Sequence, residues 1–334
     1  MSKVVIGMDL GGTNIKTALV STEKKVIAKD SRPSNAEKGP EGVMDAMESA
    51  VTDLLQESKV SRSNVIACGI GAPGPMNWQT GVVYSPPNLL GWENVPLAQL
   101  MHQRLNIPCY VDNDANVACY GEYWLGAGQG TESMSVLTLG TGVGGGMVVF
   151  GQLMRGIDGT AAELGHIKVQ RDGRMCGCGC KGCLEAYASV SGMIRTAVDA
   201  IGDYPDSSLY KKYNDKLDEL TGKAISDAAK KGDAFAKWVF EETATWLGLG
   251  IASLINLQNP ERIVLCGGMI DAGDVLFEPV IRIAKANAFS VPAKRCEIVP
   301  AGLGSDSGVI GAAGCALSRF ESGEEAVADR GGPY

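Results

Sequence analysis

The chain has 334 residues, enough for about two domains of ordinary size with separate hydrophobic cores. Its formal net charge is −8 and its lysines and arginines form no block, so a nucleic-acid backbone would find little positive charge to bind. No apolar run approaches the about 18 residues that cross a bilayer, and the N-terminus lacks the basic and apolar segments of a secretory signal. We therefore expect a cytoplasmic protein.

Strand-like apolar segments alternate with helical patterns along the chain, which predicts an α/β fold. The first of them, residues 4–10, ends in the turn Gly11-Gly12-Thr13. Residues 134–139 repeat this design and end in Gly140-Thr141-Gly142-Val143-Gly144. Two strand–turn units of the same kind predict two related half-domains.

Both glycine turns are suited to phosphate, because glycine lets the backbone approach an anion and its N–H groups then point at phosphate oxygens. A third glycine pair follows the apolar residues 263–265. Asp9, just before the first turn, can hold Mg²⁺ through water or cap the turn. Since neither a P-loop nor a dinucleotide fingerprint is present, a Rossmann oxidoreductase is a poorer interpretation. The predicted cofactor-binding residues are Asp9, Gly11, Gly12, Thr13, Thr141, Gly142, Gly144, Gly267 and Gly268.

A polar cluster follows the apolar residues Tyr110 and Val111, where residues 112–116 read Asp-Asn-Asp-Ala-Asn and a helical pattern begins. Aspartate and asparagine are natural helix caps, but one cap is enough, so the others are free to face a cleft. An aspartate at the end of a strand can accept the proton of a substrate hydroxyl in phosphoryl transfer. Residues 73–96 form a loop region rich in proline and glycine, and loops of this size are usually functional. There, Asn88 offers a donor and an acceptor to sugar hydroxyls, and Trp92 is expected to anchor the loop by packing.

Four cysteines lie within the eight residues from Cys176 to Cys183, ten residues after His166. This spacing predicts a zinc site, and the best ligand set is His166, Cys176, Cys178 and Cys183. Cys180 is then a spare thiol that could compete for the fourth position. A disulfide knot is the alternative, but the other cysteines are scattered like buried apolar residues. Glu163 and Glu185 bracket the ligands and offer carboxylates to polar hydroxyls.

These motifs resemble those of the ROK (repressor, open reading frame, kinase) family of sugar kinases, within the actin and hexokinase-like superfamily. The resemblance covers residues 3 to about 316. Its carriers are DLGGT (Asp9–Thr13), PGP (Pro73–Pro75), NLLGW (Asn88–Trp92), DNDAN (Asp112–Asn116), LGTGVGGG (Leu139–Gly146), ELGH (Glu163–His166), CGCGCKGCLE (Cys176–Glu185) and LCGG (Leu265–Gly268). Asp112 stands where relatives often have glutamate.

The resemblance implies a two-domain, actin-like and hexokinase-like (ribonuclease H-like) ATPase fold with a cleft between the domains. A small N-terminal α/β domain would comprise residues 1–115, and a larger α/β domain with the zinc loop would comprise residues 116–305. The last helix, at about 306–320, would pack back on the small domain. Residues 321–334 are polar, acidic and rich in glycine, which predicts a disordered tail.

The implied activity is ATP-dependent phosphorylation of the 6-hydroxyl of a hexose, because chains with ELGH and NLLGW are similar to glucokinases. Asp114 would be the catalytic base, Mg²⁺ would accompany ATP, and zinc would be structural. A homodimer is expected, since dimers are common in this family and twofold pairing is the general default. The implied sugar-binding residues are Asn88, Asn113, Asp114, Glu163, His166 and Glu185.

Several alternatives share these motifs. Kinases for fructose, mannose, N-acetylglucosamine and N-acetylmannosamine resemble one another across them, and polyphosphate or ADP in place of ATP would leave no mark in the sequence. A DNA-binding repressor of the same family is disfavoured, because the first strand is expected at Val4, without an upstream helix-turn-helix, and no basic patch is present. A sugar-binding regulator without catalysis is disfavoured by intact Asp9, Asp114 and both glycine turns.

Overall fold

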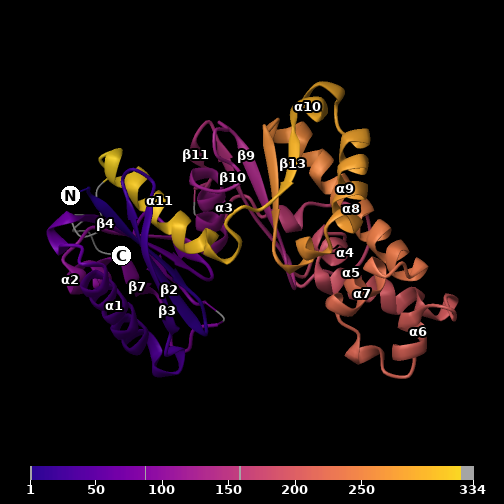
Figure 1. Cartoon of the computed structure of the whole chain (residues 1–334), viewed down its shortest axis with the longest axis horizontal. Helices are drawn as coiled ribbons and strands as arrows, with labels where there is room; N and C mark the ends of the chain where they lie inside the picture. Colours follow the sequence, from indigo (N-terminus) through magenta and orange to yellow (C-terminus); the bar gives the residue numbers. More distant parts are fainter. Residues whose placement is uncertain (1, 87, 158, 325–334) are drawn as a thin grey trace.

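The computed structural model describes residues 2–86, 88–157 and 159–324, and Figure 1 shows that they form two lobes. The strands are β1 Val4–Leu10, β2 Asn14–Ser21, β3 Val26–Pro33, β4 Val65–Ala72, β5 Met76–Asn77, β6 Val82–Val83, β7 Val95–Pro96, β8 Cys109–Asn113, β9 Met134–Leu139, β10 Val143–Val149, β11 Gln152–Leu153, β12 Arg262–Cys266 and β13 Glu297–Pro300. The helices are α1 Gly39–Ser58, α2 Leu97–Leu105, α3 Asp114–Trp124, α4 Glu185–Ala188, α5 Val190–Ala200, α6 Ser208–Tyr213, α7 Gly222–Lys230, α8 Ala234–Gln258, α9 Asp274–Asn287, α10 Ser290–Arg295 and α11 Ser307–Glu321.

Each lobe is built on a five-stranded sheet, and the two sheets have the same topology. The order is β3-β2-β1-β4-β8 in the small lobe and β11-β10-β9-β12-β13 in the large lobe. In both, the first three strands pair antiparallel and the last three pair parallel. The predicted α/β class and the predicted pair of related half-domains are therefore confirmed.

Strand β1 is apolar except for Asp9 near its end, as expected for a strand in a sheet with helices on both faces. On one face, α11 lies unusually close to β1 and β4, and two glycines make this possible. A side chain at Gly7 would come within 2.0 Å of the carbonyl oxygen of Val309, and one at Gly69 within 1.9 Å of that of Ala312. Helix α11, the last one among the described residues, thus packs directly on the first sheet.

The proline-rich region 73–96 is more regular than the sequence predicts, because it contains the antiparallel sheet β5-β6-β7. Trp92 is only 2% exposed and packs in the core of the small lobe, so its predicted role as an anchor is confirmed.

The predicted tail begins too early. Glu321 is the last residue of α11, and the Glu324 carboxylate accepts a hydrogen bond from the Arg319 side chain at 2.9 Å. The Tyr110 hydroxyl also donates to the Glu324 carbonyl at 3.0 Å, so residues 321–324 belong to the fold. Residues 325–334 of the predicted tail lie outside the described residues. The domain limits at residues 115 and 305 stay a prediction.

The chain passes between the sheets twice, from α3 to β9 and from β13 back to α11, and one buried carboxylate ties the two passages together. Glu122, on α3, is fully buried. Its carboxylate accepts hydrogen bonds from the backbone N–H of Ala127 on the first passage, and of Gly302 and Leu303 on the second, each at 2.9 Å. The four residues form a junction, called here the Glu122 junction.

Among the described residues, no helix combines the length and the apolar character needed to span a membrane.

Candidate functional site

A cleft of about 560 Å³ lies between the lobes, with walls from both sheets and from the starts of α3 and α11. Its lining residues are Asp9, Asp114, Ala115, Ala118, Thr138, Gly140, Gly142, Val143, Gly144, Glu163, His166, Glu185, Ser305, Ser307 and Gly308. The cleft brings together residues that the sequence analysis assigned to catalysis, sugar binding and phosphate binding.

The polar segment between β8 and α3 sends one carboxylate into the cleft. Asn113 caps α3, because its side-chain oxygen accepts from the backbone N–H of Ala115 at 2.9 Å and of Asn116 at 3.3 Å. Asp112 and Asn116 are buried and hydrogen-bonded to each other at 3.1 Å. Asp114 is the acidic residue of this segment that lines the cleft. Besides capping the helix, the Asn113 side chain hydrogen-bonds the Asp114 carboxylate.

The carboxyl groups of Asp9 and Asp114, which both line the cleft, have pKa values above that of an aspartate in water. Asp114 keeps much of its surface accessible, yet the surrounding cleft removes enough water to raise the pKa of its carboxyl above the ordinary value. The pKa of Asp9 is also raised, mainly by burial and further by the nearby charge of Asp114, while Lys16 opposes this shift. Two neighbouring carboxylates are oxygen ligands of the kind Mg²⁺ prefers, so the residues fit such an ion.

The opposite wall carries Glu163, His166 and Glu185. A single turn of 3-10 helix, Leu164–His166, sets His166 so that its Nε2 lies 4.0 Å from the Glu163 carboxylate. Glu185 begins α4, and its Oε2 accepts from the backbone N–H of Val143 at 2.9 Å. Glu185 therefore connects the second glycine turn to the segment that contains the cysteines.

The predicted phosphate residues divide among three places. Gly142 and Gly144 line the cleft, whereas Thr141 lines a neighbouring cavity of about 270 Å³. Gly268 lines a third cavity of about 310 Å³ beside Lys223. Gly267 has a φ of 91° and lies against the backbone of Leu139. A side chain would not fit there, so this glycine lets the ends of β9 and β12 approach each other closely.

The first glycine turn and two predicted sugar ligands lie outside the lining of the cleft. Within the described ranges, neither residues 11–13 nor Asn88 and Asn113 are among the lining residues. Asn88 lies on the first turn, since a side chain at Gly12 would come within 3.1 Å of the Asn88 carbonyl oxygen. Asn88 and Gly12 therefore lie side by side. In this conformation, Asn88 does not line the cleft with Glu163 and Glu185.

The predicted zinc ligands form a compact cluster. The donor atoms of His166, Cys176, Cys178 and Cys183 all lie within 4.8 Å of one another. The Cys176 sulfur is 3.7 Å from His166 Nδ1, and the sulfurs of Cys178 and Cys183 are also 3.7 Å apart. A tetrahedral zinc ion with usual bond lengths separates neighbouring donors by about 3.6–3.8 Å, so the donor set fits zinc. Cys180 is exposed and is not part of the cluster, and none of the ten cysteines forms a disulfide.

Sequence reasoning missed several residues of the cleft. Thr138 lies near the end of β9, Ser305 lies just before α11, and Ser307 and Gly308 begin α11. A signal for the last three is present, since residues 302–308 read Gly-Leu-Gly-Ser-Asp-Ser-Gly directly before an apolar helix. Lys16 was also missed; its ammonium group donates to the Ser305 carbonyl.

Comparisons with known proteins agree with the fold and with the residues of the cleft. The sequence model that describes the ROK family matches residues 5–319. This chain belongs to the ROK family. A glucokinase from Halalkalibacterium halodurans is 41% identical over 307 residues, which are 92% of this chain and 92% of that protein. A glucokinase from Thermotoga maritima is 36% identical, with 95% of this chain and 98% of that protein covered.

A solved structure extends the comparison to three dimensions. The ROK family glucokinase from Streptomyces griseus, in complex with glucose and AMPPNP, superposes with a TM-score of 0.73 at 36% identity. The superposition covers 94% of this chain and 99% of that one. The resemblance to the ROK family and the expected actin-like, hexokinase-like fold are therefore confirmed.

Proposed function

We propose that this ROK protein transfers the terminal phosphoryl group of ATP to the 6-hydroxyl of a hexose, with glucose as the preferred acceptor. The observation that carries the proposal is the Asp114 carboxylate, which opens into a cleft shared with Glu163, His166, Glu185 and the second glycine turn. The similarity to glucokinases over nearly the whole chain supports the same activity.

In the proposed reaction, Asp114 binds the 6-hydroxyl and aims its oxygen at the terminal phosphorus. The new oxygen–phosphorus bond forms as the bond to the β-phosphate oxygen breaks, the hydroxyl proton passes to Asp114, and ADP leaves. Phosphoryl transfer has a loose transition state, so orientation of the hydroxyl contributes more than its full deprotonation. The raised pKa of Asp114 suits a group that must accept a proton near neutral pH.

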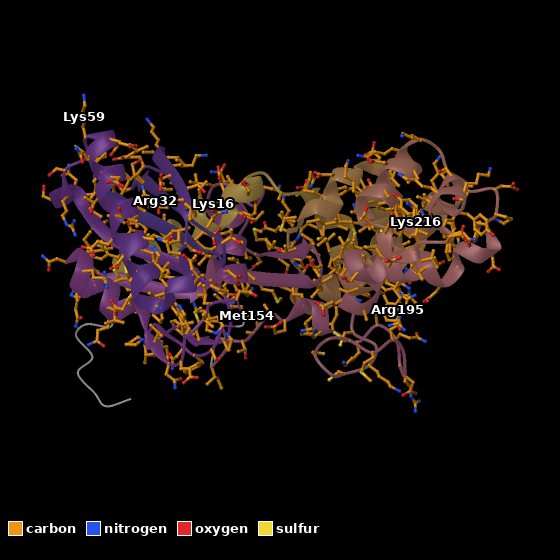
Figure 2. All side chains as sticks on the ribbon, turned by 90° about the horizontal axis from the view of Figure 1, so that it is seen from below. Lys16, Arg32, Lys59, Met154, Arg195 and Lys216 are labelled. Atoms are coloured by element: carbon orange, nitrogen blue, oxygen red, sulfur yellow. The ribbon has the colours of Figure 1, made fainter. Side chains whose placement is uncertain are left out.

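Phosphate contacts are assigned to the glycine turns, whose backbone N–H groups can point at phosphate oxygens. Asp9 would hold Mg²⁺ through water, and the ion when bound would neutralise charge on the phosphates. Lys16 lies beside Asp9 and Ser305, at the edge of the same cleft, and Figure 2 shows it on the side of the small lobe that faces the junction of the lobes.

We assign a structural role to zinc at His166, Cys176, Cys178 and Cys183. Four protein ligands leave no open position for a reacting water. Because His166 turns Nδ1 toward Cys176, its Nε2 is left on the side of Glu163, where it can bind a sugar hydroxyl. Zinc would therefore hold the imidazole and, through the neighbouring Glu185, the sugar-binding wall in place.

A test of the proposed acceptor is a coupled assay of ADP release with magnesium and ATP. Glucose, mannose, fructose, N-acetylglucosamine and N-acetylmannosamine are compared by kcat/KM. We expect glucose to lead by about tenfold or more, equivalent to about 1.4 kcal/mol of discrimination. A different leading sugar would move the specificity within the same mechanism, and no turnover with any of the five would refute a hexose kinase. Replacing ATP by polyphosphate in the same assay tests the donor.

We also propose a cytoplasmic homodimer. Ten free cysteines suit a reducing compartment, and twofold pairing is the commonest assembly of soluble proteins. Sedimentation should give twice the chain mass of 35.0 kDa, and a monomer at micromolar concentration would contradict the assembly.

A further inference from the structure

A buried ion pair joins the segment of the proposed base to a segment of the large lobe. The Asp112 side chain is 4% exposed, and its Oδ2 accepts from Nε of Arg155 at 2.6 Å. Its Oδ1 accepts from the backbone N–H of Asn113 at 2.9 Å and from the Asn116 side chain at 3.1 Å. Asp112 thus holds both ends of the turn that contains Asp114 and is itself held by Arg155.

Arg155 begins the segment that leads to the opposite wall of the cleft. It follows β11 by two residues, and eight residues later the chain reaches Glu163. The Arg155 side chain is 14% exposed, and its guanidinium lies 4.8 Å from the ring centre of Trp78 in the small lobe. Figure 2 shows Met154, the residue before Arg155, where the two lobes meet.

The same segment touches Trp78 at a second place. A side chain at Gly159 would come within 3.1 Å of the Trp78 ring, and the Ala161 N–H donates to the Arg155 carbonyl at 3.1 Å. Residues 155–157 and 159–163 therefore lie against one another and against the small lobe. The buried charge of Arg155 is balanced by Asp112.

We propose that Arg155 and Asp112 are positioning residues, which set the distance and angle between Asp114 and the wall formed by Glu163 and His166. The proposal rests on the proposed function, since these are the groups that would hold the sugar between base and phosphate. Neither Arg155 nor Asp112 lines the cleft, so both act through other residues. A buried charge that loses its partner forces the surrounding residues to rearrange. Here those residues lie in the two segments that would hold the sugar from opposite sides.

The test is a double-mutant cycle of Arg155→Gln, Asp112→Asn and the double variant. Each single variant leaves one buried charge unbalanced, whereas the double variant leaves none. We expect Arg155→Gln to lower kcat/KM for the sugar about 10²-fold, mostly through KM, because small misplacement of reacting groups is costly. The KM for ATP should stay unchanged. The double variant should lose much less than the product of the two single losses.

Arg319→Met is the matched control. Arg319 is 4% exposed, and its guanidinium lies 5.3 Å from the ring centre of the same Trp78, but it belongs to α11 and does not pair with Asp112. We expect this variant to lower Tm without raising the KM for the sugar. The proposal is overturned if the losses in the cycle are additive, if Arg155→Gln raises both KM values equally, or if it changes Tm alone.

Hydrogen exchange of the backbone amides tests the positioning role without relying on the proposed kinase activity. In Arg155→Gln, the amides of residues 113–116 and 155–166 should lose protection together, whereas α11 keeps its protection. This result is independent of turnover. A wild-type protein without sugar kinase activity refutes the proposed function but leaves the exchange test standing, and unchanged exchange in both segments overturns the link. If Arg155→Gln does not fold, Asp112→Asn supplies the same comparison, because it breaks the same ion pair.

Discussion

Replacing Asp114 by asparagine is expected to lower kcat by about 10²- to 10⁴-fold, which is the usual contribution of a general base. Asparagine keeps the size of the side chain and can still hydrogen-bond a hydroxyl, but it cannot accept the proton. Because Asp114 is at the first position of α3 and not its cap, the helix should remain intact. Steady-state kinetics should therefore show a loss in kcat with a small change in the KM for the sugar.

The same variant is expected to be more stable than the wild type at neutral pH. The pKa of Asp114 is raised in the folded protein, so the folded state binds its proton more tightly than the unfolded state does. Stability then falls as the pH rises from the unfolded pKa to the folded pKa, and the full cost is present above the folded pKa. Asparagine removes this cost. The Tm of the variant should exceed that of the wild type at pH 7, and the difference should shrink as the pH falls toward 4.

Asp206→Asn serves as the control, because Asp206 is exposed on the large lobe away from the cleft. It should leave both kcat and Tm unchanged. A kcat for Asp114→Asn within about tenfold of the wild-type value would exclude a base role of the usual size. A lower Tm for Asp114→Asn than for the wild type at pH 7 would show that the charged Asp114 stabilises the fold. It would contradict the expectation that this charge destabilises the folded protein.

Removal of the metal is expected to have the second large effect. Structural zinc sites contribute their binding free energy to folding, so loss of the ion should release the segment that positions His166 and Glu185. We expect one zinc per chain by elemental analysis. Chelation should lower kcat/KM for the sugar by about 10²-fold or more, since both side chains would lose their alignment.

Two cysteines form a matched pair for this test. Cys178 and Cys180 are both exposed and lie two residues apart, but the Cys178 sulfur is in the cluster and the Cys180 sulfur is not. Cys178→Ser should lose zinc and sugar phosphorylation, while Cys180→Ser should keep both. Equal effects of the two substitutions would contradict the ligand assignment. A metal-free protein with full activity would contradict the structural role itself.

The cluster of one histidine and three cysteines, and the place of Asp114 in the cleft, could be predicted because their signals are local. Cysteines at a spacing of two to five residues can surround one ion without information on the rest of the fold. The turn at Asp114 was predictable for a similar reason, since a helix needs one cap and the sequence offers several. Asn113 takes that role, and Asp114 is free to face the cleft.

Other parts of the site depend on contacts that no local pattern encodes. Ser305 and Ser307 reach the cleft because α11 returns to the first sheet, whose glycines admit it. Asp112 and Arg155 are 43 residues apart and approach from different lobes, so their spacing carries no signal. The composition of residues 321–324 predicted disorder, yet the hydroxyl of Tyr110, 214 residues earlier, donates to the Glu324 carbonyl. Long-range packing decided each of these cases.

The Glu122 junction determines how the two lobes can move. Two passages of the chain that ran separately would let the lobes slide as well as turn. Here a single buried carboxylate binds both passages, and sliding would break its hydrogen bonds to three backbone groups. Rotation about this point costs least, because it changes a few backbone angles and leaves those bonds intact. We therefore expect the lobes to turn about the Glu122 junction, a motion that would change the distance between the two glycine turns.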